Sequence, residues 1–203
     1  MRAIIPGQRD VLLVIDVQND FCPGGALAVA RGHEVVPVIN DLIRRFDHVV
    51  LTQDWHPRGH GSFASSHPDK QPYSEVSMPY GSQTLWPDHC IQASNGASFH
   101  DNLSWSKAEM VIRKGFRSAI DSYSAFFEND RTTPTGLTGY LRERGITRVF
   151  CAGLALIIAC GTRLKTPTPS DLKLTSLKMP AGPLTWAERR KPPATACRHS
   201  VSA

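Results

Sequence analysis

Val11-Leu12-Leu13-Val14-Ile15-Asp16 is an unbroken run of aliphatic residues that ends in a carboxylate. A strand that is buried on both faces of a parallel sheet has this composition, because helices cover both of its faces. The run therefore predicts a central parallel strand, with Asp16 at its carboxyl end.

Other predicted elements follow in alternation along the chain. Apolar residues at helical spacing predict a helix over Glu34–Phe46, and Leu137–Glu143 fits a second, shorter helix. Apolar runs predict strands over His48–Thr52, Met110–Arg113 and Arg148–Leu156. This alternation indicates a three-layer α/β/α fold with a parallel sheet, and such sheets bind ligands at the carboxyl ends of their strands. Residues 57–101 are rich in Pro, Gly, Ser and His, which predicts functional loops.

The composition changes after Leu156. From Ile157 onward there are eight Lys and Arg against two acidic residues, a charge of +6, so residues 1–156 carry 5 − 6 = −1. The 43 residues from Gly161 to Ala203 contain six prolines and almost no apolar periodicity. We therefore expect an incomplete domain over residues 1–156, because four strands are too few to finish it, and a basic, proline-rich tail over residues 157–203.

Composition also excludes several classes of partner. The positive charge lies in the tail, whereas nucleic-acid binding needs a basic surface organised on a fold. No apolar stretch approaches the ~18 residues of a membrane helix. The five cysteines have no paired short spacing, and an odd number without a signal peptide suggests reduced thiols in the cytoplasm.

A candidate metal site follows the second predicted strand. Asp54 and His56 are two residues apart, so in an extended chain both side chains point the same way and can reach one ion. With His89, they make a two-histidine, one-carboxylate set that suits Zn²⁺, Fe²⁺ or Mn²⁺. The alternative is a group of polar loop residues that binds no metal.

Two further side chains at strand ends are candidates for catalysis. Asp16 can accept a proton from a thiol or a substrate amide, or it can simply cap a turn. Lys114 can hold a thiolate by its charge, or it can be a solvated lysine at the end of a strand. Three aromatic residues can either form a wall for a planar ring or pack in the core: Phe21, Trp86 and Tyr123.

Seven segments resemble, in the same order, the motifs of nicotinamidases within the isochorismatase-like cysteine hydrolases. The resemblance covers about residues 9–156. The Asp54, His56 and His89 set and the segment around Tyr123 favour nicotinamidases over isochorismatases. The segments are Val14-Ile15-Asp16-Val17-Gln18-Asn19-Asp20-Phe21-Cys22, Thr52-Gln53-Asp54-Trp55-His56-Pro57, His60-Gly61-Ser62-Phe63-Ala64, Trp86-Pro87-Asp88-His89-Cys90, Arg113-Lys114-Gly115, Asp121-Ser122-Tyr123-Ser124-Ala125-Phe126 and Gly153-Leu154-Ala155.

This resemblance implies hydrolysis of a small molecule, nicotinamide, to nicotinate and ammonia through a cysteine acyl-enzyme, a step of NAD salvage. It makes Asp16 the base that takes the thiol proton and Lys114 the group that stabilises the thiolate. The backbone amide of Ala155, after a cis peptide from Leu154, joins that of the nucleophile in the oxyanion hole.

The resemblance also implies the binding residues. Asp54, His56 and His89 hold one divalent metal ion that orients the pyridine nitrogen, with His60 as a possible extra ligand. The three aromatic residues named above flank the ring.

The resemblance ends where the nucleophile belongs. The family continues Gly-x-Ala-x-Asp-x-Cys-Val, and counting from Gly153 places its aspartate at position 157 and its cysteine at position 159. This chain has Ile157 and Ala159 there, and Cys160 follows one residue late. One residue along a helix turns a side chain by about 100°, and a misplacement of about 1 Å can cost ~10²-fold in rate. Cys160 is therefore the candidate thiol that remains in this chain, out of the family's register.

A single missing base accounts for this break. With codons that the genetic code allows for residues 156–162, inserting one G after codon 156 gives Leu-Asp-Tyr-Cys-Val-Arg-His, which restores the motif. In the shifted frame, the codon that spans Met179 and Pro180 must encode Ala, and the codon that spans Trp186 and Ala187 must encode Gly. Both residues fit a later family motif. We therefore hypothesise a change of reading frame after Leu156.

Three interpretations stay open from the sequence. The chain is a nicotinamidase by descent; or it is another hydrolase of the family, acting on isochorismate or a carbamoylated amine; or it is a non-catalytic remnant that keeps a metal or ligand site. The first two differ in substrate, and the third predicts no turnover.

Overall fold

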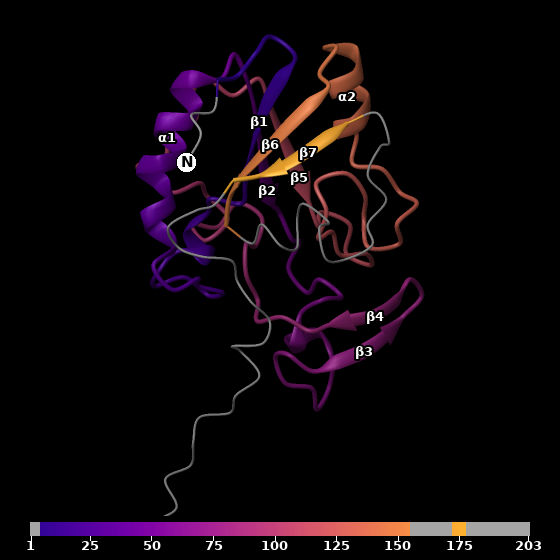
Figure 1. Ribbon diagram of the computed structural model, residues 1–203. Helices are drawn as coiled ribbons and strands as arrows, with labels where there is room; N and C mark the ends of the chain where they lie inside the picture. The colour runs from indigo at the N-terminus through magenta and orange to yellow at the C-terminus, as the bar shows by residue number, and fades with distance from the viewer. Residues whose placement is uncertain (1–4, 155–171, 178–203) are drawn as a thin grey trace, which may run out of the picture.

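The computed structural model describes residues 5–154 and 172–177, which form a parallel sheet with a helix on each face (Figure 1). The sheet has the strand order β5-β2-β1-β6-β7, and every neighbouring pair in it is parallel. Its strands are β1 (Asp10–Ile15), β2 (His48–Asp54), β5 (Met110–Lys114), β6 (Arg148–Gly153) and β7 (Lys173–Ser176). The helices are α1 (Val35–Arg45) and α2 (Leu137–Glu143).

Two hydrophobic clusters separate the three layers. Leu12 and Val14 of β1 belong to the cluster that α1 covers, whereas Val11 and Leu13 belong to the cluster that α2 covers. Side chains alternate between the faces of a strand, so an unbroken apolar run fills both clusters. The three-layer α/β/α prediction is therefore confirmed.

The predicted elements of residues 5–154 are present, with small shifts at their ends. α2 has the predicted bounds, and β2 continues two residues beyond Thr52 to Asp54. Short 3₁₀ turns at Asn19–Phe21, Gly32–Glu34 and Ala64–Ser66 connect the larger elements.

The expectation of loops throughout residues 57–101 is wrong in one place. β3 (Glu75–Met78) and β4 (Gly81–Thr84) form an antiparallel hairpin that lies apart from the main sheet (Figure 1). Strands of four residues carry too few apolar positions to give a clear alternation, which explains why the sequence does not reveal them.

The tail predicted from residue 157 onward includes one strand that the sequence pattern does not indicate, Lys173–Ser176. This segment pairs in parallel with β6 as strand β7, and Leu172 beside it is buried in the cluster that α2 covers. Its lysine and hydroxyl side chains obscure Leu174, which packs against the same cluster. The chain thus supplies a fifth strand, at the edge of the sheet.

Among residues 5–154 and 172–177, the structure has no helix that is long and apolar enough to cross a membrane.

Candidate active site

Asp16 lies at the carboxyl end of β1, where the neighbouring strands also end. Its backbone has a φ of 49°, a left-handed conformation that is unusual for a residue other than glycine. The Thr52 hydroxyl donates to Asp16 Oδ1 at 2.6 Å, and Lys114 Nζ lies 2.9 Å from Asp16 Oδ2. Thr52 is in β2 and Lys114 ends β5, so the parallel register places three chain-distant polar groups together.

Lys114 joins Asp16 to Asp54. Its ammonium lies 2.6 Å from Asp54 Oδ1, and all three side chains are buried. Burial raises the pKa of Asp16 to about 6, although Lys114 opposes this shift. Burial lowers the pKa of Lys114, but the two carboxylates outweigh it and raise that pKa above its usual range. The site therefore holds a permanent cation beside a carboxylate that titrates near neutrality.

Asp54, His56 and His89 offer ligand atoms that all lie within 4.8 Å of one another. His89 Nδ1–H donates to the Pro87 carbonyl at 2.8 Å, which leaves Nε2, 3.9 Å from Asp54 Oδ2, free to act as a ligand. Burial and the neighbouring His56 lower the pKa of His89 to about 4, so its imidazole is neutral. His56 Nδ1 is buried without a hydrogen-bond partner among the described residues. This donor set fits a divalent metal ion.

His60 lies beside His56, with 4.7 Å between the ring centroids, but its nitrogens are already engaged. Nε2 contacts the Arg117 carbonyl at 2.8 Å, so it carries the proton and donates. Nδ1 therefore accepts, and it lies 2.8 Å from the Ser62 hydroxyl and 3.1 Å from the Ser62 amide nitrogen. In this arrangement His60 has no free nitrogen for a metal ion.

The three aromatic residues make different ring contacts. Trp86 and Tyr123 pack edge to face at 6.1 Å, and the Trp86 indole N–H donates to the Tyr123 hydroxyl at 3.0 Å. Phe21 packs instead against the ring of His89, at 5.7 Å. A ligand beside the metal set would therefore meet the Trp86–Tyr123 pair and Phe21 as separate contacts.

Gly115 permits the close approach of the backbone to His56. Its φ is +63°, and a Cβ at this position would lie 2.4 Å from His56 Nε2. We expect Gly115→Ala to destabilise the chain by about 2–4 kcal/mol, because the buried imidazole has no room to move. Denaturant unfolding measures this loss.

Gly59→Ala is the matched control for that substitution. Gly59 has a nearly identical φ of +69°, but no atom of the described residues lies within 4 Å of its Cβ position. Gly59→Ala should therefore lose only the free energy that a left-handed backbone costs a residue with a Cβ, about 1 kcal/mol. Equal losses for the two variants would show that the contact with His56 does not matter.

Several residues that hold the site together have no role that the sequence pattern indicates. The Gln18 side-chain amide makes two hydrogen bonds with the backbone of Asp54. Gln18 Nε2 donates to the Asp54 carbonyl at 2.8 Å, and the Asp54 backbone N–H donates to Gln18 Oε1 at 2.8 Å. Asp121 Oδ1 lies 3.2 Å from His56 Nε2. The motifs that carry the resemblance include all three of these residues, Thr52, Gln18 and Asp121. Membership in a motif was therefore the sequence signal that could have found them.

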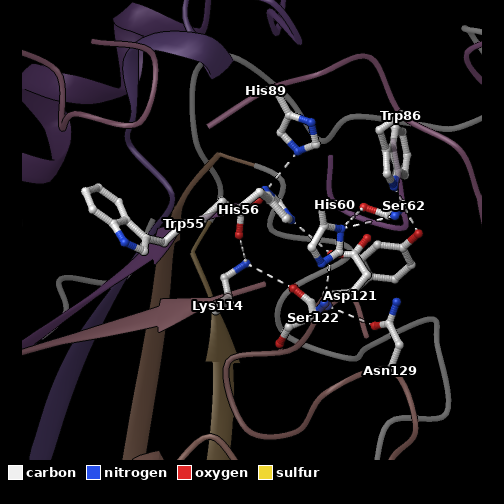
Figure 2. Close-up of polar contacts among 12 residues, drawn as sticks. Trp55, His56, His60, Ser62, Trp86, His89, Lys114, Asp121, Ser122 and Asn129 are labelled. Carbon is white, nitrogen blue, oxygen red and sulfur yellow. Dashed lines mark hydrogen bonds and ion pairs between the residues drawn. The ribbon is translucent and has the colours of Figure 1, made fainter. Parts of the chain in front are cut away.

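Three predicted positions lie outside the described residues. These are Ala155 with the peptide bond before it, Ala159 in the family's nucleophile slot, and Cys160. The described site therefore comprises the predicted base, lysine, metal set and aromatic residues. Figure 2 labels Lys114, His56, His89 and Trp86 of this site.

Comparison with known proteins identifies the family of this chain. The Isochorismatase domain family matches residues 10–164. The nicotinamidase of Acinetobacter baylyi is 55% identical over 144 residues, which are 71% of this chain and 67% of that protein. A substantial part of each chain thus lies outside the matched region.

Solved structures give the same result. The yeast nicotinamidase Pnc1p bound to the inhibitor nicotinaldehyde superposes with a TM-score of 0.76 at 30% identity, covering 87% of this chain and 89% of that chain. The pyrazinamidase of Pyrococcus horikoshii in complex with zinc superposes with a TM-score of 0.60 at 28% identity, covering 83% and 99%. With its fold and with these matches, the chain belongs to the isochorismatase family of hydrolases.

Proposed function

We propose that this fold carries the active site of a nicotinamidase, which hydrolyses nicotinamide to nicotinate and ammonia. The observation that carries the proposal is the buried bridge of Lys114 between Asp16 and Asp54, because it joins a proton acceptor to a metal ligand. The 55% identity to a nicotinamidase supports the choice of substrate. The product, nicotinate, suits a role in NAD salvage.

Asp16 is the proposed base. Its pKa of about 6 lets it be ionised at neutral pH and still accept a proton from a thiol. Lys114 is too strongly held by its two carboxylates to give up its own proton, so it supplies a fixed positive charge beside the thiolate. The backbone amide of Ala155 is the proposed oxyanion donor.

Asp54, His56 and His89 would hold one divalent metal ion. A bound ion of this kind supplies a Lewis acid that can take the pyridine nitrogen of the substrate as a ligand. The zinc in the pyrazinamidase of Pyrococcus horikoshii supports this assignment. Phe21, Trp86 and Tyr123 would limit the positions of the ring around it.

The residue at the nucleophile position limits the activity that this chain can have. We propose that the hydrolase domain lies mainly in residues 1–156 and that residues 157–203 are read in a shifted frame, with Lys173–Ser176 among them joining the sheet as β7. Ala159 stands in the nucleophile slot, and Cys160 is one residue away from it. This observation favours a second candidate function, a non-catalytic protein that keeps the metal and ring sites.

Substrate choice is tested with a gene that carries one extra G after codon 156. We expect the metal-loaded product of this gene to release ammonia from nicotinamide and to leave isochorismate unchanged, because the site offers a base and a metal set for an amide with a ring nitrogen. A coupled ammonia assay and chromatography of the isochorismate sample measure both reactions. Turnover of isochorismate with none of nicotinamide would contradict the proposal.

We propose that the protein acts on this small molecule in the cytoplasm. In the described part of the chain, Cys22 and Cys90 are buried free thiols, which suits a reducing compartment.

A further inference from the structure

Asp121 is a buried carboxylate that contacts a metal ligand without belonging to the proposed metal set. Its side chain is 4% exposed, and it follows β5 in the chain. Oδ1 lies 3.2 Å from His56 Nε2 and accepts the Ser122 backbone N–H at 2.8 Å. Oδ2 accepts from Gln83 Nε2 at 3.2 Å. Each oxygen therefore has a defined partner.

These contacts decide which nitrogen of His56 carries the proton. An ionised carboxylate only accepts hydrogen bonds, so the Nε2 that faces Asp121 must be protonated. A neutral imidazole has one N–H, so the lone pair of His56 is then on Nδ1. That atom is buried and has no hydrogen-bond partner among residues 5–154 and 172–177. Figure 2 shows His56 between Asp121 on one side and His89 on the other.

A second metal site at the same residues is the competing explanation. His56, His60 and Asp121 also offer ligand atoms within 4.8 Å of one another. However, His60 uses one nitrogen for the Arg117 carbonyl and the other for Ser62. A metal ion there would have to break a hydrogen bond of a buried histidine, so the geometry favours a supporting role for Asp121 over a role as a ligand.

We propose that Asp121 is a positioning residue, which fixes His56 as the Nε2–H tautomer and so presents Nδ1 to the metal ion. This inference rests on the metal site of the proposed function. Gln83 of the β3–β4 hairpin holds the other carboxylate oxygen and also donates to the Tyr123 hydroxyl at 2.7 Å. The hairpin thus connects the orientation of His56 to the proposed ring contact.

Cobalt titration of the full chain tests the proposal. We expect Asp121→Asn to weaken Co²⁺ binding by about 10–100-fold, because a neutral acceptor holds the N–H less firmly. The Co²⁺ visible absorption band, with a competing chelator, gives the affinity without any activity assay. Asp101→Asn is the control, since this exposed carboxylate lies outside the site, and its affinity should be unchanged.

The outcomes separate this proposal from the metal site itself. His89→Ala should abolish the Co²⁺ band; a chain that binds no Co²⁺, or whose binding survives this substitution, would overturn the metal site and the proposal together. Binding that depends on His89 but is equal in Asp121→Asn would overturn the proposal alone. Complete loss in Asp121→Asn, equal to that of His89→Ala, would also overturn it, because Asp121 would then be a ligand.

Nuclear magnetic resonance supplies a test that does not depend on the folding of a variant. In the unsubstituted chain loaded with Zn²⁺, ¹H–¹⁵N correlations of the imidazole should show His56 with a proton on Nε2 and the metal on Nδ1. The opposite assignment, with the metal on Nε2, would overturn the proposal.

Discussion

Inserting one G after the codon for Leu156 is expected to raise the rate of nicotinamide hydrolysis by about 10⁶-fold over the chain as written. The described residues already place Asp16, Lys114 and the metal set together, and Ala159 stands where the family has its reacting cysteine. Removal of a catalytic nucleophile costs a hydrolase a factor of this size. Ammonia release from purified, metal-loaded protein measures the difference.

Two controls isolate the cause of that gain. Inserting a complete codon at the same place keeps the frame of this chain and should leave the rate at background. Asp16→Asn in the frame-corrected chain should lose most of the gain, because the thiol proton then has no acceptor. If the chain as written already hydrolyses nicotinamide within tenfold of the corrected chain, Cys160 or another group is the nucleophile and the frameshift hypothesis is wrong.

Lys114→Met is expected to lower the free energy of unfolding of the metal-free chain by about 3–5 kcal/mol at pH 8. Methionine has a similar length, but its neutral side chain leaves the carboxylates of Asp16 and Asp54 buried beside each other without a cation. Urea unfolding in the presence of a chelator measures the loss. Lys70→Met, at an exposed position, should change stability by less than about 0.5 kcal/mol.

The loss should shrink as the pH falls. The folded-state pKa of Asp16, about 6, is above its ordinary value of 3.8, so between these values the folded chain binds more protons than the unfolded chain. Stability from this group is present at low pH and is lost as the pH rises through 6. Lys114 lowers the pKa of Asp16, so without it the folded chain loses this proton at a higher pH. Lys114→Met should therefore regain stability by pH 5. A loss that is equal at pH 5 and pH 8 would contradict this account.

Much of the fold could be predicted because buried strands leave strong local patterns. Val11–Ile15 predicts the central strand, and Leu137–Glu143 predicts a helix with the bounds that the structure has. Weakly apolar strands could not be predicted in this way. β3 and β7 are four residues long, and their place depends on partners elsewhere in the chain.

The sequence by itself determined which kinds of residue stand at the carboxyl ends of the strands, and therefore the family and the chemistry that its site can support. It also determined the break at the nucleophile, because Ala159 is a matter of residue identity. These conclusions need only residue types and their order.

Only the tertiary structure decided which of those residues contact each other, and therefore which role each can have. Lys114 reaches Asp16 across 98 positions of the chain, His56 meets Asp121 across 65, and Gln83 meets Asp121 across 38. Such contacts depend on strand register and on the path of the loops, which residue spacing along the chain does not encode. For the same reason, only the structure shows that both nitrogens of His60 are engaged and that His56 Nδ1 has no hydrogen-bond partner in the described part of the chain.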